Sequence, residues 1–154
     1  MAQIRTGSSM PDLQLLDAQN KVYNLRQQSN GKACVVYFYP KDDTPGCTAE
    51  ACSFRDSYQD FVDIGALVIG ISSDSPESHR KFADKHKLPF VLLSDAKKEA
   101  RQAFGVPSDL LGLIPGRVTY VFNPQGVCVG VYKSQLNAQA HVSEALKLIK
   151  QMKP

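Results

Sequence analysis

Residues 34–47 have the sequence CVVYFYPKDDTPGC, and this stretch carries most of the information about fold and site. Its first part, 34–39, is a continuous apolar, β-branched and aromatic run, which predicts a strand buried on both faces of a sheet. A polar loop follows, and then Thr44 and Pro45 are residue types preferred at the N-cap and the first position of a helix. The stretch therefore predicts a buried strand that leads through a short loop into a helix whose third residue is Cys47.

Strands and helices alternate on both sides of this stretch. The remaining strands are expected at 13–16 and 22–25 (an N-terminal hairpin), 67–71, 89–93, 118–122 and 127–132. Apolar residues that share one helical face predict a helix over 51–61. Further helices are expected from Ser75, at 96–104 and after Asn137, with a loop at 110–116. The β-α-β opening and β-β-α close predict an α/β thioredoxin-like fold with a central mixed sheet, flanking helices and the hairpin as an extension. In such sheets the loop 40–47 lies at the carboxyl ends of the strands, where sites are usually built.

Length and charge narrow the class of protein. The 154 residues fit a single domain spanning 1–154. Lys and Arg number 18 against 15 Asp and Glu, a net charge of +3 without a basic cluster, which does not predict nucleic-acid binding. No apolar run is long enough for a membrane span, and the first residues lack the apolar segment of a signal peptide. The protein is therefore expected either to stay in the compartment where it is made or to have lost a presequence.

Cys47 is the strongest candidate for chemistry. At the third position of a helix, the unpaired backbone N–H groups and the helix dipole favour a thiolate. The Thr44 hydroxyl is expected near enough to hydrogen-bond the sulfur or a bound oxygen. The alternative is a buried, inert cysteine at a helix start.

Cys52 lies five positions after Cys47 on the same predicted helix. In an ideal helix the two Cα atoms are about 8.6 Å apart, whereas a disulfide requires them within about 7 Å. A bond between them would require local unwinding, which suits a catalytic switch better than a structural staple. Taken by itself, Cys52 is better interpreted as a small apolar residue on the helix.

The other candidate residues give weaker signals. Cys34 and Cys128 fall inside predicted strands and are expected to be inert core residues. A metal site is not expected, because no second cysteine pair is near and the histidines are dispersed. His79 and His86 are expected to be partly exposed on a helix, and His141 to be solvated. Arg117 opens a buried strand, so it lies either at the surface or in a site.

These motifs resemble the peroxiredoxins. The spacing Pro40-x-x-x-Thr44-x-x-Cys47 is similar to the signature of that family, and Arg117 is similar to its distant active-site arginine. The run TPGCTAEAC over 44–52 resembles the peroxiredoxin Q, or bacterioferritin-comigratory, branch, which has a second cysteine five residues after the first. The run LLGLIPGR over 110–117 resembles plastid and cyanobacterial members of that branch. The resemblance extends over about 7–149.

The resemblance implies a thioredoxin-dependent peroxidase that reduces hydrogen peroxide and organic hydroperoxides. Cys47 would become a sulfenic acid, and Cys52 would condense with it to an intramolecular disulfide. Arg117 and Thr44 would activate the peroxide, Pro40 would shield the pocket, and Glu50 would orient the arginine. The resemblance further implies recycling by a thioredoxin-type dithiol, a monomer, and no metal, haem or flavin. It implies a cytoplasmic protein of bacterial or cyanobacterial type, or a plastid protein whose transit peptide has been removed.

Two alternatives remain at this stage. A glutathione peroxidase-like enzyme shares the thioredoxin fold, but its usual tryptophan-containing motif is impossible in a chain without tryptophan. A redox sensor could pass a disulfide to a partner without turning over peroxide. Peroxide turnover with a recycling reductant distinguishes an enzyme from a sensor.

Overall fold

The computed structural model describes residues 3–109, 114–135 and 137–152. Seven strands form one mixed sheet in the order β2-β1-β5-β4-β3-β8-β9, and two short strands form a separate ribbon, β6-β7. The strands are β1 (Gln14–Asp17), β2 (Val22–Asn24), β3 (Cys34–Phe38), β4 (Leu67–Ser72), β5 (Val91–Ser94), β6 (Ser108–Asp109), β7 (Ile114–Pro115), β8 (Val118–Phe122) and β9 (Cys128–Lys133). The helices are α1 (Leu25–Gln28), α2 (Pro45–Asp56), α3 (Tyr58–Asp63), α4 (Pro76–His86), α5 (Glu99–Phe104) and α6 (Ala138–Gln151).

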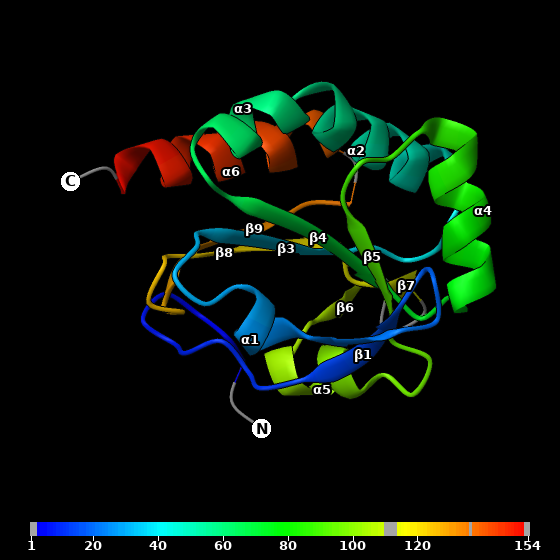
Figure 1. Cartoon of the computed structure of the whole chain (residues 1–154), viewed down its shortest axis with the longest axis horizontal. Coiled ribbons are helices and arrows are strands. Elements are labelled where there is room, and N and C mark those ends of the chain that lie inside the picture. The colour runs from blue at the N-terminus through cyan, green and yellow to red at the C-terminus, as the bar shows by residue number, and fades with distance from the viewer. Residues whose placement is uncertain (1–2, 110–113, 136, 153–154) are drawn as a thin grey trace.

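The helices cover the sheet on two sides (Figure 1). α2, α3 and α6 lie on one face, and α1 and α5 lie on the other. β3, β4 and β5 are parallel to one another, whereas β8 pairs antiparallel with β3 on its other side. The expected thioredoxin-like α/β architecture with a mixed central sheet is confirmed, and β1 and β2 form the expected antiparallel hairpin.

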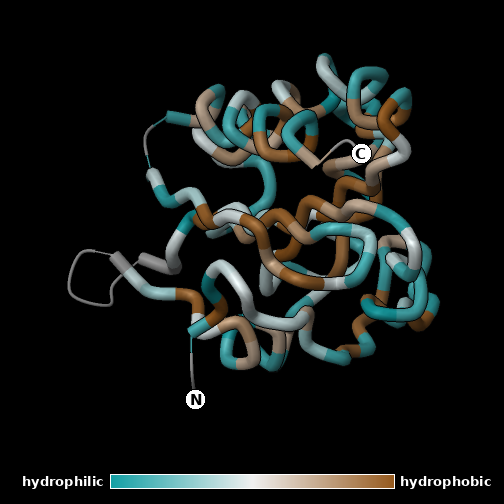
Figure 2. The backbone as a smooth tube through the Cα atoms, turned by 90° about the vertical axis from the view of Figure 1, so that its left-hand side faces the viewer, coloured by the Kyte–Doolittle hydropathy of each residue, from teal (hydrophilic) through white to brown (hydrophobic). Residues whose placement is uncertain are grey.

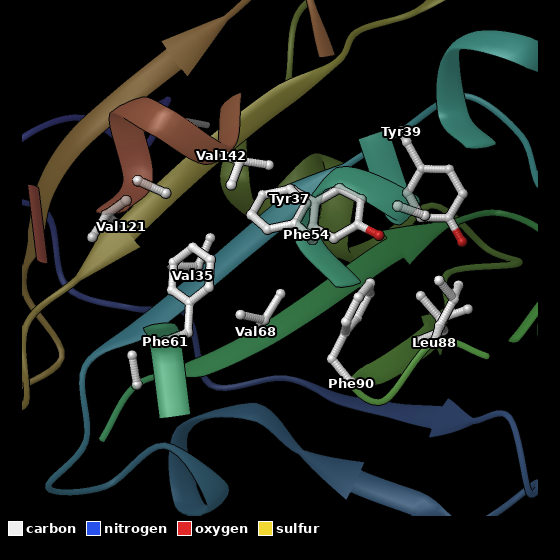
Figure 3. Packing of buried hydrophobic residues seen from close by; sticks show 14 of the residues in the cluster. Val35, Tyr37, Tyr39, Phe54, Phe61, Val68, Leu88, Phe90, Val121 and Val142 are labelled. Carbon is white, nitrogen blue, oxygen red and sulfur yellow. The ribbon is translucent and has the colours of Figure 1, made fainter. Parts of the chain in front are cut away.

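β3 is an interior strand between β4 and β8, and all of its residues are buried. Its side chains alternate between two apolar clusters, as the period of a strand requires. Val35 and Tyr37 belong to the cluster beneath α2, α3 and α6, which also contains Phe54, whereas Val36 and Phe38 belong to the cluster on the α5 side. Figure 3 shows the first cluster, where the Phe54 ring stacks on Tyr37 with centroids 4.6 Å apart. Hydrophobic colouring follows the sheet through the middle of the molecule, and more polar segments lie in the helices around it (Figure 2).

Several predicted boundaries differ in the structure. The single helix expected over 51–61 is wrong, because Ser57 leaves the helical conformation at φ −101° and ψ 6° and separates α2 from α3. α5 begins at Glu99, later than expected, because Lys98 adopts a left-handed conformation before it. The strand expected at 89–93 begins only at Val91. The loop expected at 110–116 lies partly outside the described residues, and its last part forms the unexpected strand β7.

The remaining helix signals are confirmed. Ser75 and Asn137 are the N-caps of α4 and α6, and each side chain accepts a bond from the backbone of the following turn. Gly105 ends α5 in the left-handed conformation. Within the described part of the chain, no helix combines the length and the apolar character of a membrane span.

Candidate active site

Cys47 lies in the first turn of α2 and is only 1% exposed. As predicted, α2 begins at Pro45 with Thr44 at the N-cap position. The Thr44 hydroxyl, however, donates to the Lys41 carbonyl at 3.0 Å and does not cap the helix. The first N–H groups of a helix have no partner within it, and here the N-cap side chain does not accept them. They are therefore available to an anion or a peroxide oxygen beside Cys47.

Arg117 lies in the interior, which decides between the two positions that its sequence context allowed. It is 5% exposed, and its Nη2 donates to Cys47 Sγ at 3.2 Å. Its Nη1 donates to Glu50 Oε1 at 2.7 Å, and its Nε donates to the Gln135 carbonyl at 3.2 Å. Three acceptors in three directions hold the planar guanidinium in one orientation, with one edge facing the sulfur.

Glu50 is fully buried behind Arg117, on the same helix as Cys47. Burial raises the pKa of Glu50 to about 7, because desolvation penalises the carboxylate more than the neighbouring guanidinium favours it. Among the described residues, its second oxygen, Oε2, has no hydrogen-bond partner. His141 Nδ1 lies 3.5 Å from that oxygen.

His141 is fully buried, so the expectation that it is solvated is wrong. Its Nε2 lies 2.8 Å from the Ser134 carbonyl, which can only accept, so Nε2 carries the hydrogen. Burial lowers the pKa of His141 to about 4, and the ring is therefore neutral near pH 7. Nδ1 then accepts from the Thr119 hydroxyl at 2.7 Å, which uses its single lone pair. The neutral imidazole therefore adds no positive charge beside Glu50 that would lower the pKa of this carboxyl.

The other cysteines occupy different environments. Cys52 is half-buried further along α2, and the four cysteines are free thiols in this structure. Cys34 and Cys128 are buried in the strands where they were expected. Burial raises the pKa of both thiols, that of Cys34 to about 12, which makes them poor nucleophiles.

A buried polar network supports the loop that precedes α2. His79 is fully buried, so the expectation of partial exposure is wrong for this residue, whereas His86 is indeed partly exposed. His79 Nδ1 lies 2.7 Å from Asp42 Oδ2, and His79 Nε2 donates to the Leu93 carbonyl at 2.9 Å. The Tyr39 hydroxyl donates to the other oxygen of Asp42.

Asp74 joins this network through the Asp42 backbone N–H, which donates to Asp74 Oδ2 at 2.8 Å. Asp42, Asp74 and His79 bring carboxylate and imidazole atoms within 4.8 Å of one another. Those atoms already bond to one another, to serine hydroxyls or to backbone, which fits a brace between α4, β5 and the loop 40–43. Half-buried Pro40 begins that loop, and Tyr39 separates it from the end of β3 at Phe38.

Sequence reasoning missed two kinds of residue near the site. Asp42 and His79 are 37 positions apart, and nothing in their spacing indicates a pair. Arg101 is 9% exposed and donates only to backbone carbonyls, which leave no mark in the sequence. The sequence carried one signal for the His79 pair: on the helix that became α4, this histidine lies close to the apolar residue Phe82.

Comparison with known proteins gives the family. Residues 6–130 match the AhpC/TSA family. The chain belongs to this family. Within it, this peroxiredoxin is 50% identical over 152 residues to the chloroplastic peroxiredoxin Q of Sedum lineare, covering 99% of the chain and 81% of that relative. It is 48% identical over 149 residues to the chloroplastic peroxiredoxin Q of Arabidopsis thaliana, covering 97% and 68%.

Solved structures agree with this assignment. The peroxiredoxin superposes on peroxidoxin BcpB of Mycobacterium tuberculosis with a TM-score of 0.90 and 32% identity, covering 99% of this chain and 100% of that one. For the Xanthomonas campestris bacterioferritin comigratory protein, which has alkyl peroxide reduction activity, the TM-score is 0.84 at 29% identity, with 98% of each chain covered. This peroxiredoxin therefore belongs to the Q branch. It is a thiol-dependent peroxidase, and a thioredoxin-type dithiol is its class of reductant.

Proposed function

We propose that Cys47 is the cysteine that reacts with peroxide and that Arg117 is the cation that activates it. The observation that carries this assignment is the 3.2 Å contact between Arg117 Nη2 and Cys47 Sγ inside a buried site. A fixed guanidinium stabilises a thiolate and also the negative charge that develops on a peroxide oxygen. Glu50 supports the arginine from the opposite side through its 2.7 Å ion pair.

In the first step the Cys47 thiolate attacks the terminal oxygen of the hydroperoxide. A sulfur–oxygen bond forms and the oxygen–oxygen bond breaks, so that sulfur loses two electrons and becomes a sulfenic acid. The leaving oxygen takes up a proton and departs as water or an alcohol. The N–H groups at the start of α2 and the Arg117 guanidinium face the oxygen on which charge develops. Pro40 shields the thiolate from water, and Thr44 shapes the start of the helix and lies within the peroxide pocket.

In the second step Cys52 is the resolving residue. Its thiol attacks the sulfenic sulfur, a disulfide forms, and water leaves. Both cysteines lie on α2, so the first turns of this helix must unwind for the sulfurs to meet. A thioredoxin-type dithiol then restores both thiols by thiol–disulfide exchange and is itself oxidised.

We further propose both hydrogen peroxide and alkyl hydroperoxides as substrates. The alkyl peroxide reduction activity of the similar Xanthomonas campestris protein supports the second class. An intramolecular disulfide needs no second subunit, which supports a monomer formed by one domain over 1–154. The chloroplastic relatives favour a plastid or cyanobacterial setting, and the bacterial neighbours favour a bacterial cytoplasm.

Cysteine variants test the assignment. Cys47→Ser should abolish peroxide consumption. Cys52→Ser should still consume one equivalent of peroxide but should lose turnover with a thioredoxin. Cys34→Ser and Cys128→Ser are the matched controls and should behave like the wild type. After one equivalent of peroxide, peptide mapping should find a Cys47–Cys52 disulfide within one chain.

Two results would refute these roles. Continued peroxide consumption by Cys47→Ser would remove Cys47 from the reaction. A dominant disulfide to Cys34 or Cys128, or a covalent dimer, would remove Cys52 from the resolving role. Sedimentation of the reduced and oxidised protein tests the monomer.

A further inference from the structure

Arg101 is a buried arginine to which the reaction described above gives no role. It lies on α5, on the face of the sheet opposite to α2 (Figure 1), and is 9% exposed. Burying a guanidinium is costly unless its donors are satisfied. The acceptors that satisfy it indicate what the residue does.

The two ends of the Arg101 guanidinium bind two segments of the active site. Nη2 donates to the Tyr39 carbonyl at 3.0 Å, and Nη1 donates to the Gly116 carbonyl at 3.2 Å. These carbonyls belong to the residues immediately before Pro40 and Arg117. One rigid side chain therefore fixes the separation between the peptide unit that starts the loop leading to Cys47 and the peptide unit that carries Arg117.

Arg101 is itself held firmly. The Asp95 carboxylate accepts the backbone N–H groups of Ala100 and Arg101 at 2.9 and 3.0 Å, which fixes the start of α5. The guanidinium carbon lies 5.6 Å from the centroid of the Phe38 ring. The Arg101 side chain therefore starts from a fixed helix, α5, and packs against a ring of strand β3 where it reaches the two carbonyls.

The Gly116 side of this contact is equally constrained. A Cβ atom built on Gly116 would lie 1.9 Å from the Pro107 carbonyl oxygen, so this position accepts only glycine. The peptide that Arg101 binds is thus clamped between the guanidinium and the chain at Pro107. A small displacement of Gly116 would pass directly to the next residue, Arg117.

The charge of Arg101 is not neutralised by a direct ion pair with any described residue. Its contacts are carbonyls and an aromatic ring, and its charge interacts favourably first with the Asp95 carboxylate and less strongly with Cys47. A neutral apolar residue would fill this space at lower desolvation cost if packing were its only task. The paired contacts with the Tyr39 and Gly116 carbonyls point to the active site.

We propose that Arg101 is a positioning residue for peroxide reduction, which sets the place of the Arg117 guanidinium relative to Cys47 by bridging the Tyr39 and Gly116 carbonyls. The proposal rests on the roles assigned to Cys47 and Arg117 above. Lysine at this position keeps the charge but presents a single ammonium group, which cannot span two carbonyls as the planar fork does. The bridge rather than the charge is therefore what Arg101→Lys removes.

The test separates the two halves of the catalytic cycle. Competition with a haem peroxidase for limiting hydrogen peroxide measures the rate of Cys47 oxidation. Reaction of the oxidised protein with dithiothreitol measures the rate of disulfide reduction. Arg101→Lys should slow the oxidation step by about ten- to a hundredfold, the scale expected when a reacting group is misplaced. The reduction step should stay within about twofold of wild type, because it does not use the arginine pair.

Arg26→Lys is the matched control. Arg26 also donates through its guanidinium to a backbone carbonyl, that of Met10, at 2.5 and 3.2 Å. The Arg26→Lys substitution should leave both half-reactions unchanged. Arg101→Gln, which keeps one donor group and removes the charge, is the second variant in case the lysine protein does not fold.

A double-mutant cycle tests whether Arg101 acts through Arg117. In an Arg117→Ala background, Arg101→Lys should add little further slowing, since the group that it positions is gone. Oxidation within twofold of wild type, equal slowing of both half-reactions, full additivity with Arg117→Ala, or failure of both Arg101 variants to fold would each overturn the proposal. Peroxide consumption by Cys47→Ser would instead overturn the site assignment itself, so the two failures are distinguishable.

Discussion

Arg117 Nη2 and Cys47 Sγ lie 3.2 Å apart although the two residues are 70 positions apart in the sequence. The sheet explains this proximity. In the antiparallel pair of β3 and β8, Phe38 lies opposite Val118. The end of β3 that leads to Pro40 and the start of β8 that follows Arg117 are therefore at the same edge of the sheet, and α2 brings Cys47 back over it.

Removal of the arginine should affect the chemistry more than the fold. We expect Arg117→Ala to slow Cys47 oxidation by about 10²–10³-fold, the usual loss when one preorganised charge-stabilising contact is removed. Thermal unfolding should be compared at pH 6, where Glu50 is largely neutral and does not become an unpaired buried charge. An oxidation rate within twofold of wild type would place Arg117 outside the reaction.

Gly46 offers a way to displace the guanidinium without removing it. A Cβ atom built on Gly46 would lie 3.0 Å from Arg117 Nη2, closer than such contacts normally are. Gly46→Ala should slow Cys47 oxidation about tenfold through this displacement. Because alanine favours a helix more than glycine, the melting temperature should be unchanged or higher. Stopped-flow oxidation and thermal melts check the two effects, and a rate equal to wild type would contradict the argument.

Glu50 should give the protein a specific pH dependence of stability. Its pKa is about 7 in the fold, against an ordinary value of 4.5. Between these two pH values the folded protein binds more protons than the unfolded chain, so its free energy of unfolding falls as pH rises. The loss should total about 3 kcal/mol across this window, at 1.36 kcal/mol per pKa unit.

Glu50→Gln isolates this contribution, because it removes the titrating group with little change of shape. From pH 4.5 to pH 7 the free energy of unfolding of the variant should rise relative to that of the wild type. At higher pH the difference between the two proteins should be constant. Urea unfolding over that range measures it. A difference that does not change with pH would show that Glu50 is already ionised at the acidic end.

Oxidation should unwind the start of α2. The Cα atoms of a cysteine pair five positions apart must approach from about 8.6 Å to about 5.5–6 Å, which a regular helix does not allow. Hydrogen exchange of the reduced and oxidised forms should show lost protection over residues 48–55, while α6 keeps its protection. Equal protection in both forms would mean that the cysteines bond without leaving the helix.

The sequence predicted the elements whose signals are local. The apolar run of β3 and the Thr44-Pro45 helix start needed no knowledge of the rest of the chain, and both are confirmed. The hairpin, β4, β8 and the capped helices α4 and α6 follow from similar local patterns. The break at Ser57 was missed because the apolar period continues across it from α2 into α3.

The interior polar groups could not be predicted, because their partners are distant or are backbone atoms. His141 depends on Thr119 and on the Ser134 carbonyl, which a helical pattern does not reveal. His79 depends on Asp42 in the same way. Arg117 could be named as a candidate, but its inward orientation follows from the register of β8 against β3, which only the folded chain shows.

The different burial of Cys47 and Cys52 has a consequence for covalent inhibitors. Cys47 is 1% exposed, so a small hydroperoxide can reach its sulfur more easily than a bulky electrophile can. Cys52 is half-buried and is the thiol of α2 that such a reagent meets first. An alkylating compound selected for reaction with the reduced protein should therefore label Cys52 and leave Cys47 able to react once. After one reaction with peroxide, the enzyme alkylated at Cys52 would remain a sulfenic acid at Cys47. Further peroxide, the substrate that the enzyme normally removes, can oxidise this form irreversibly.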